Sequence, residues 1–213
     1  MISDELKKWR KSERARLIAA RMALNAEQLA GNRQAIDAHL TRVLPNFARG
    51  IIAFCWPYRN EYDARYLARR LRTLGASTAL PVVIASGQPL IFRLWKPGGA
   101  LAKGVYDIPY PASGGAVIPD VALVPMNGFD AGGYRLGYGG GFFDRTLAAM
   151  CAGDSPRSVA IGVAYELARM ETIHPQPYDI PMDYVVTERG VYERKNSGLI
   201  FLDAPGGEFA AAR

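Results

Sequence analysis

The chain has 213 residues, of which 49% are hydrophobic and 22% charged, so the composition is that of a globular protein and excludes a disordered one. Its net charge of +6 favours an anionic partner, such as a nucleotide, a polycarboxylate or a nucleic acid. The two cysteines, Cys55 and Cys151, have no metal-like spacing, and we expect a cytoplasmic location. No signal peptide is expected, because the N-terminus is charged and lacks an apolar core. No transmembrane segment is expected either, because glycines and prolines interrupt the longest uncharged stretch, residues 73–92.

The first fifty residues are predicted to form two helices. Apolar residues recur at steps of three and four in the first of them. Asn25 followed by Gln28 resembles a capping box that starts the second helix, whose apolar face runs from Leu29 to Phe47. Much of the positive charge lies in these helices, and either a basic patch or an ordinary solvated surface would account for it.

From residue 51 onward, predicted strands alternate with predicted helices. The apolar run 51–56 (IIAFCW) predicts a strand buried on both faces. A helix should follow, with Asn60 as its N-cap. Its inward-facing residues are expected to be Ala64, Leu67, Leu71 and Leu74. Residues 81–85 and 90–95 predict a strand pair, and residues 97–119 predict a loop rich in glycine and proline.

The second half of the chain continues this alternation. Further strands are expected at residues 121–125, 158–164 and 183–187. A helix is predicted from about Phe142 to Cys151, and the tail 204–213 is expected to be disordered. The pattern predicts one α/β domain over residues 1–203, built on a mainly parallel sheet.

A glycine-rich segment, Gly132–Asp144 (GGYRLGYGGGFFD), lies between the strand at 121–125 and the helix that follows. Ligands of open α/β sheets bind beyond the carboxyl ends of strands, which is where this segment falls. Glycine amides can approach an anion closely, and the next helix points its N-terminal amides at the same place. Arg135 supplies a forked donor for phosphate, and Asp144 supplies a carboxylate for Mg²⁺. We therefore predict a phosphate-binding loop in an enzyme that uses ATP.

An alternative interpretation is that the glycines only shape a tight turn and that Asp144 caps the helix. The segment contains neither the GxxxxGK[ST] pattern of Walker loops nor the GxGxxG pattern of dinucleotide-binding folds. An arginine before the glycines and an acid after them favour the phosphate interpretation.

Residues 119–148, PDVALVPMNGFDAGGYRLGYGGGFFDRTLA, resemble the signature of the 5-formyltetrahydrofolate cyclo-ligase family. WPYRNEYD (56–63) is similar to the folate-site segment of that family, IGVAYE (161–166) to its late strand, and residues 174–188 to its closing segment. The resemblance covers about residues 10–188. It implies a three-layer α/β/α sandwich. It also implies that the enzyme uses Mg·ATP to convert 5-formyltetrahydrofolate into 5,10-methenyltetrahydrofolate, with release of ADP and phosphate.

The resemblance further implies roles for individual residues. Arg135 and Asp144 would be catalytic, Asp144 and Asp179 would position Mg²⁺, and Trp56 and Glu61 would contact the folate. The residues expected to bind ATP are Arg10, Arg14, Arg135, Gly137, Tyr138, Gly139, Gly140, Gly141, Phe142 and Phe143. Without the resemblance, Glu61 reads equally well as an acid in the first turn of a helix, where the dipole favours it.

The chain departs from the family's pattern at three places. The N-terminal K-x-x-x-R of the family aligns on Arg10 and Arg14, which share a helix face and can grip one anion, although a solvated basic face is the alternative. The aromatic pair before the motif's aspartate often contains tyrosine and is Phe142–Phe143 here, so any help from that hydroxyl is missing. Gly140 stands where some members have lysine, which would place more of the phosphate charge on Arg135 and the metal.

The expected chemistry is phosphorylation of the formyl oxygen, attack by N10 on the activated carbon, and loss of phosphate. Phosphoryl transfer needs positioning and charge neutralisation, which suits glycine amides, arginines and carboxylates. Asp130, Asp183 and His174 are expected to have structural roles. The expected partners are Mg·ATP and 5-formyltetrahydrofolate, with or without a polyglutamate tail, and the expected assembly is a monomer or small homo-oligomer.

Other functions remain open at the level of sequence. A divergent paralogue with the same nucleotide loop could act on another substrate. A sugar-phosphate isomerase or a CoA transferase on a similar fold would not need ATP. A basic nucleic-acid-binding module is disfavoured, because no helix-turn-helix, RNA-binding aromatic signature or zinc spacing is present, and we expect neither a nucleic-acid nor a membrane partner.

Overall fold

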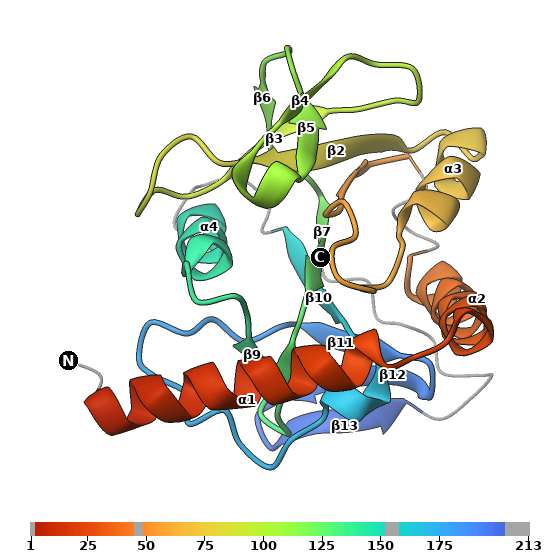
Figure 1. The fold of residues 1–213 in the computed structure, drawn as a ribbon. Helices are drawn as coiled ribbons and strands as arrows, with labels where there is room; N and C mark the ends of the chain where they lie inside the picture. The colour runs from red at the N-terminus through yellow and green to blue at the C-terminus, as the bar shows by residue number, and fades with distance from the viewer. Residues whose placement is uncertain (1–2, 45–48, 152–157, 203–213) are drawn as a thin grey trace.

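The computed structural model describes residues 3–44, 49–151 and 158–202. Phe47 and the tail 204–213, about which we made predictions, lie outside the described residues, and the assignment of residues 1–203 to one domain stays a prediction. In the described part, helices lie on both faces of a nine-stranded sheet (Figure 1). None of the helices in these ranges is long and apolar enough to cross a membrane.

The two N-terminal helices are confirmed, as α1 (Asp4–Met22) and α2 (Ala26–Val43). The side chain of Ser3 caps α1 by accepting a hydrogen bond from an amide of its first turn. The predicted capping box of α2 is present, because Asn25 and Gln28 each accept from the other's backbone N–H, at 2.9 and 3.0 Å.

The sheet has the strand order β13-β12-β11-β10-β7-β1-β2-β3-β6. Its strands are β1 (Ile51–Ala53), β2 (Ser77–Val82), β3 (Ile91–Leu94), β6 (Ala116–Val117), β7 (Val121–Pro125), β10 (Val159–Val163), β11 (Tyr184–Thr187), β12 (Gly190–Lys195) and β13 (Gly198–Leu202). The five central strands, from β11 to β2, are parallel, and the pairs at both edges are antiparallel. The predicted mainly parallel sheet is therefore confirmed.

Two helical layers cover the sheet, as the three-layer prediction requires (Figure 1). α2 and α3 (Arg65–Thr73) pack on one face, over a core that includes Ile36, Leu40, Leu67, Leu71, Ile52 and Leu123. α4 (Phe142–Cys151), whose predicted bounds are confirmed, packs Leu147 on the other face against Ala122, Val124 and Ala160. Small alanines in the central strands let α4 approach closely.

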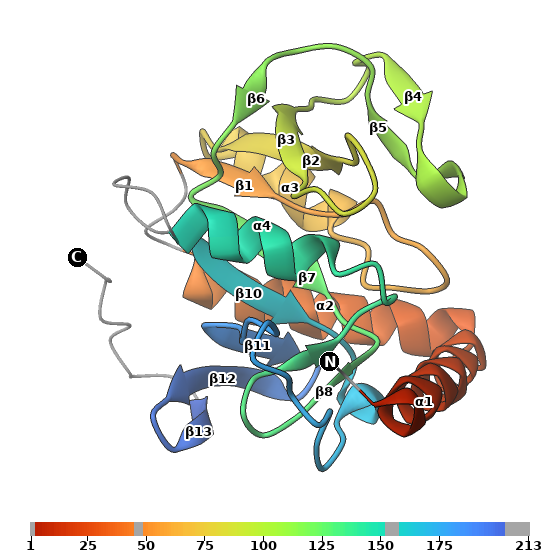
Figure 2. The same cartoon turned by 90° about the vertical axis from the view of Figure 1, so that its left-hand side faces the viewer.

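α1 lies apart from these layers, on the side toward which the arrow of β10 points (Figure 2). Its Leu17 packs with Leu136 and Ile173, which belong to segments beyond the carboxyl ends of the parallel strands. The other two buried residues of α1 are Arg10 and Arg21. The helix therefore presents buried arginines, and not a continuous apolar stripe, to the rest of the molecule.

The helix after β1 differs from its prediction at both ends. It begins at Arg65 with Ala64 in the N-cap position, so the prediction of Asn60 as N-cap was wrong. Asn60 and Arg59 have φ values of 58° and 49°, so they form a left-handed turn, which asparagine tolerates. Leu74 follows the last helical residue and is 54% exposed. The other expected inward-facing residues are buried: Ala64, Leu67 and Leu71.

Several strand bounds also differ. β1 ends at Ala53, before the end of the apolar run, and β2 begins at Ser77. The predicted pairing of β2 with β3 is confirmed, and the two strands are antiparallel. The expected loop 97–119 contains a small hairpin of β4 (Leu101–Lys103) and β5 (Pro109–Pro111), together with β6. The hairpin of β12 and β13 had no counterpart in the prediction.

Candidate active site

The candidate site is built from four segments: α1 and three loop segments that contact it. These are α1 itself, the loop 54–64 after β1, the segment 126–141 after β7, and the loop 169–183 before β11. The segment after β7 contains a short hairpin of β8 (Gly128–Phe129) and β9 (Arg135–Leu136). The site thus lies beyond the carboxyl ends of parallel strands, where ligands of α/β sheets bind.

Asp130 holds the glycine-rich segment in shape. Its Oδ1 accepts hydrogen bonds from the backbone N–H groups of Gly132 and Tyr134, at 2.9 and 3.1 Å. Its Oδ2 accepts from the N–H of Ile173 at 3.0 Å, which joins this segment to the loop before β11. The structural role expected for Asp130 agrees with these bonds, and Asp183 likewise accepts from the N–H of Ala160 at a strand start.

Arg135 and Asp144, which the sequence prediction assigned to one phosphate site, lie together. The Arg135 side chain is only 3% exposed, and its Nη2 lies 3.0 Å from Asp144 Oδ1. Its Nη1 donates to the carbonyl oxygen of Ile180 at 2.8 Å, and the N–H of Ile180 donates to Asp144 Oδ1 at 3.1 Å. Burial lowers the pKa of Arg135, and the carboxylates of Asp144 and Asp179 oppose this effect. The carboxylate of Asp144 is thus held by Arg135 and Ile180, which lie outside its own helix.

Arg10 and Asp179 form a second buried pair, in which each side chain is 8% exposed. Arg10 Nη2 lies 2.6 Å from Asp179 Oδ2, and Arg10 also donates to the carbonyl oxygens of Ile173 and His174, at 3.2 and 2.8 Å. The N–H of Gln176 donates to the same Asp179 oxygen at 2.7 Å. A solvated basic face therefore does not describe Arg10.

Arg14 is oriented differently from Arg10, although the two are one turn apart. It is half-buried, and its Nε donates to the carbonyl oxygen of Gly137 at 2.7 Å. Its guanidinium lies 3.4–3.6 Å from where a Cβ on Gly139 would be. Burial lowers the pKa of Arg14, the charge of Arg10 adds to that, and Asp179 opposes it. Arg14 thus faces the glycine loop, and its two Nη groups have no recorded partner in the described ranges.

The glycine loop is shaped by two residues in the left-handed region, Gly139 at φ 98° and Gly141 at φ 62°. A Cβ on Gly140 would lie 2.8 Å from the ring of Phe142, so a side chain there would require that ring to move. Arg145 closes the loop by donating from Nη2 to the carbonyl oxygen of Gly140 at 2.5 Å.

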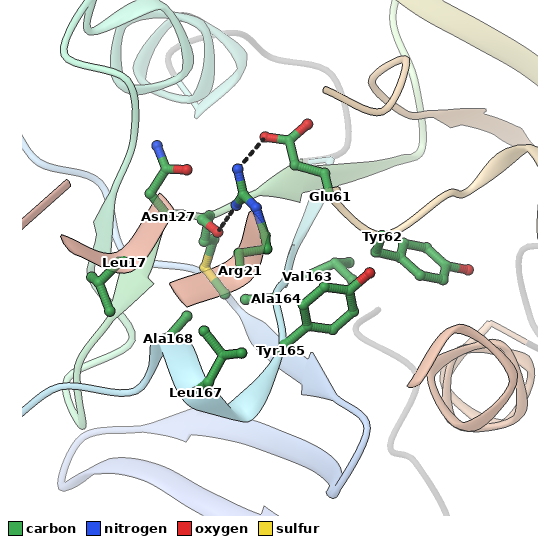
Figure 3. A pocket seen from close by; sticks show the side chains of 11 residues that line it. Leu17, Arg21, Glu61, Tyr62, Asn127, Val163, Ala164, Tyr165, Leu167 and Ala168 are labelled. Atoms are coloured by element: carbon green, nitrogen blue, oxygen red, sulfur yellow. Dashed lines mark hydrogen bonds and ion pairs between the residues drawn. The ribbon is translucent and has the colours of Figure 1, made fainter. Parts of the chain in front are cut away.

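Glu61 lies in a buried cluster at the other end of α1. Its side chain is 7% exposed; Oε1 accepts from the hydroxyl of Tyr138 at 2.9 Å and Oε2 from the N–H of Tyr58 at 3.0 Å. Arg21 Nη2 lies 3.8 Å from Oε1 (Figure 3). Burial raises the pKa of Glu61, while Arg21, Tyr138 and the N–H of Tyr58 lower it. Because α3 begins only at Arg65, the alternative of a first-turn helix acid is wrong.

Arg21 is a site residue that the sequence prediction missed. Its side chain is 6% exposed, and it donates to the carbonyl oxygen of Arg59 at 2.8 Å, to that of Met126 at 3.5 Å and to the Tyr138 hydroxyl at 2.9 Å. It therefore joins α1 to the loops after β1 and β7. Residues 10, 14 and 21 share one helix face, and that spacing was the signal that could have found it.

The remaining aromatic candidates make contacts with other residues. Trp56 meets the ring of Trp95 edge-on, with centroids 5.7 Å apart, and the Arg65 guanidinium lies 4.8 Å from the Trp56 ring centroid. Phe143 packs on the core beneath α4, and Phe142 faces Arg145. Trp56 also packs against the core cluster that contains Tyr62 and Tyr165, and its contact with the folate stays a prediction.

A small cavity of about 10 Å³, enough for one water molecule, adjoins Glu61 and Arg21 (Figure 3). Asn127 also lines it and is 2% exposed, yet neither atom of its side-chain amide has a hydrogen-bond partner among the described residues. The sequence prediction did not mark Asn127, and a buried amide without partners is unusual.

Comparisons with known proteins agree with this geometry. Residues 6–188 match the 5-formyltetrahydrofolate cyclo-ligase family. The 5-formyltetrahydrofolate cyclo-ligase of Escherichia coli K12 is 30% identical over 179 residues, which cover 81% of this chain and 97% of that protein. The protein of the same name from Mycolicibacterium smegmatis is 34% identical over 144 residues, 63% of this chain and 72% of its own.

Solved structures show the same fold. The NMR structure of Aquifex aeolicus 5,10-methenyltetrahydrofolate synthetase superposes with a TM-score of 0.72 at 26% identity and covers 95% of this chain and 98% of its own. A 5,10-methenyltetrahydrofolate synthetase from Mycoplasma pneumoniae, at 22% identity and a TM-score of 0.68, covers 84% of this chain and 98% of its own and supports the fold alone. The chain therefore belongs to the 5-formyltetrahydrofolate cyclo-ligase family, and its enzyme class is that of an ATP-dependent ligase.

Proposed function

We propose that this chain converts 5-formyltetrahydrofolate into 5,10-methenyltetrahydrofolate with cleavage of ATP to ADP and phosphate, at the face where α1 crosses the strand ends. One observation carries the proposal. The glycine loop contacts Arg14 through Gly137 and contacts Glu61 through Tyr138, so an ATP-phosphate site and a folate site would share one short segment. A phosphoryl group bound at the loop would then be close to the formyl group of a folate bound at Glu61.

The reaction needs positioning more than covalent catalysis by side chains. The formyl oxygen attacks the γ-phosphorus, the bond between the β–γ bridging oxygen and the γ-phosphorus breaks, and ADP leaves. N10 then attacks the activated formyl carbon, its proton is lost, and the carbon–oxygen bond breaks to release phosphate. A weak amide nucleophile gains most from being held in line with the phosphorus. The gathered arginines and loop amides suit that task.

The arginines divide this work according to their burial. Arg14 has unpartnered Nη groups beside the glycine loop within the described ranges, and we assign to it the direct contact with phosphate oxygens. Arg135 and Arg10 are buried against Asp144 and Asp179, and they act by holding those carboxylates in place. The predicted direct contacts of Arg135 and Arg10 with ATP stay predictions.

Asp144 and Asp179 fit a magnesium site. In the described ranges no group of three or more histidine, cysteine or acidic side chains could hold a metal alone. Mg²⁺ that bridges phosphates, however, commonly uses only one or two carboxylates. The recorded contacts engage Asp144 Oδ1 and Asp179 Oδ2, which leaves the second oxygen of each carboxylate for a metal. A bound Mg²⁺ would neutralise phosphate charge there.

The test is the cyclisation reaction with purified protein, followed by the absorbance of the methenyl product. We expect turnover with 5-formyltetrahydrofolate, ATP and Mg²⁺, and none when ATP is omitted or Mg²⁺ is chelated. Asp107→Asn, on the exposed hairpin of β4 and β5, serves as a control variant that should keep full activity. Nucleotide binding without any cyclisation would identify a divergent paralogue with another substrate.

A further inference from the structure

Tyr138 connects the glycine loop to the buried acid Glu61. Its backbone lies between Gly137 and Gly139 in the loop, and its hydroxyl lies 2.9 Å from Glu61 Oε1 and 2.9 Å from Arg21 Nη2. Arg21 can only donate, so the hydroxyl oxygen accepts from it and its own proton is directed to Glu61. The Tyr138 hydroxyl thus accepts one hydrogen bond from Arg21 and donates one to Glu61, so its proton has a defined direction.

The bond from Tyr138 completes the set of contacts that fixes Glu61. Oε2 accepts from the N–H of Tyr58, whereas the recorded neighbours of Oε1 are the Tyr138 hydroxyl at 2.9 Å and Arg21 at 3.8 Å. The latter distance is too long for a hydrogen bond. Without the hydroxyl, one oxygen of a side chain that is 7% exposed would keep only a long ion pair. The hydrogen bond from the N–H of Tyr58 would then be the one short contact among these that still orients the carboxylate.

We infer that Tyr138 is a positioning residue that holds Glu61 in one orientation as an acceptor for ring N–H groups of the folate, and so ties the folate site to the phosphate loop. This inference rests on the proposed function of Glu61. Tyr138 also supplies the one phenolic hydroxyl of the loop 137–143, where the aromatic pair is Phe142–Phe143. It acts through Glu61 and is not itself a catalytic residue.

The charges around Glu61 set the expected pH dependence. The titratable groups that face it are Arg21 from α1, Tyr138 from the glycine loop, Cys55 from the segment after β1 and Tyr165 from the segment after β10. Burial raises the pKa of Glu61, and the hydrogen bond from Tyr138 is one of the contacts that lower it. Removal of the hydroxyl should raise the pKa of Glu61 further. As the pH is lowered, Glu61 of the variant should then become protonated, and folate binding should be lost, at a higher pH than in the wild type.

The experiment compares Tyr138→Phe with Tyr66→Phe, a control on an exposed side chain of α3. For Tyr138→Phe we expect the KM for folate to rise about tenfold, the size of one hydrogen bond to a charged group, with the KM for ATP unchanged. The acidic limb of kcat/KM for folate should move to higher pH. A Glu61→Gln variant should make the further change Tyr138→Phe nearly silent, because the two residues act as a unit.

Other results would overturn the inference. A rise in the KM for ATP alone would mean that Tyr138 only shapes the loop, and unchanged constants would mean that it does neither. The inference would also be contradicted if Tyr138→Phe raised the KM for folate by the same factor in the wild type and in the Glu61→Gln variant. If the wild type binds 5-formyltetrahydrofolate without converting it, the proposed function fails. The dissociation constants, measured by quenching of tryptophan fluorescence, then still decide the role of Tyr138.

Discussion

The buried ion pair of Arg135 and Asp144 contributes to the stability of the fold and, in the proposed function, to activity. Arg135 is nearly inaccessible to solvent, so its charge depends on Asp144 and on the Ile180 carbonyl oxygen. Removal of one partner of a buried ion pair leaves an uncompensated charge, whereas replacement of both by apolar residues is often neutral. Stability and activity can therefore be separated at this pair.

We predict that Asp144→Ala abolishes Mg·ATP-dependent turnover and lowers the free energy of unfolding by about 3 kcal/mol, because Arg135 loses its counter-charge. The double variant Arg135→Met, Asp144→Leu should recover most of that stability and none of the activity. Urea unfolding and the cyclisation assay measure the two effects. Turnover by Asp144→Ala at the wild-type rate would remove Asp144 from the proposed metal site.

Asn127 offers a different kind of test, because its amide has no recorded partner in the described structure. We predict that Asn127→Leu, which has a similar volume, raises the free energy of unfolding by about 1–3 kcal/mol, the cost of leaving a polar group buried and unpaired. Thermal and urea unfolding measure this change. A loss of stability would instead show that a water in the adjoining cavity satisfies the amide.

The sequence could indicate which candidate residues lie close together where those residues belong to one short segment. Arg135 and Asp144 flank the glycines within one short segment, and the structure places them 3.0 Å apart. Asn127 gave no signal of this kind, and the only signal for Arg21 was its position on the helix face of Arg10 and Arg14, because the groups that surround both residues come from segments distant in the chain. A basic residue on a polar helix reads as solvated until the carbonyl groups that bury it are known.

Among the elements, α1 contacts the loops of the candidate site one after another along its length. Arg10 and Arg21 are eleven residues apart and lie on the same helix face, which corresponds to roughly 17 Å. Arg10 contacts the loop that carries Asp179, Arg14 contacts the glycine loop, and Arg21 contacts the segment that carries Glu61. The helix thus spaces the regions that we propose for the metal, the phosphates and the folate.

We predict opposite behaviour for the two neighbouring arginines of α1. Arg14→Ala should raise the KM for ATP at least about tenfold with little loss of stability, because Arg14 is half-buried and its recorded contact is to one carbonyl oxygen. Arg10→Ala should unfold at a clearly lower temperature, because Asp179 would be buried without its partner. Steady-state kinetics and thermal unfolding of both variants measure this, and an equal loss of stability would contradict the division of roles.

The elements of the core were predictable because each carries its own pattern. β7 and β10 are continuous apolar runs buried on both faces. The capping box at the start of α2 lies within four residues of sequence. The hairpin of β12 and β13 was not predictable in the same way. It leaves Ile200 and Phe201 about half exposed at the sheet edge, so its side chains do not alternate cleanly between apolar and polar.

At the scale of the whole molecule, the site joins segments that are otherwise separate, so ligands should stabilise the fold. Binding at a concentration of about one hundred times Kd contributes about 2.7 kcal/mol. We predict that Mg·ATP raises the melting temperature by several degrees, and that chelation of Mg²⁺ removes most of the increase. Arg14→Ala at the same ATP concentration should show a smaller increase. Differential scanning fluorimetry measures it, and an unchanged melting temperature would contradict an assembled nucleotide site.

The fold class was accessible from the order of strands and helices, and the placement of α1 was not. Its apolar residues predicted a helix but gave no indication that the helix crosses the strand ends. That position depends on pairings between the two ends of the chain, and a single sequence shows no such pairing. The predicted monomer or small homo-oligomer stays a prediction.

The long separation between Arg10 and Asp179, 169 residues, has a consequence for biosynthesis. At a translation rate of roughly 5–20 residues per second, Asp179 is made on the order of 8 to 34 s after Arg10. The partners of Arg21 and Arg14 are made earlier in that interval, whereas Arg10 still lacks Ile173, His174 and Asp179, the residues to which it donates. The ribosome therefore makes Arg10 early and its ion-pair partner late, so a nascent chain released before Asp179 would contain the glycine loop but not the Arg10–Asp179 pair of the proposed site.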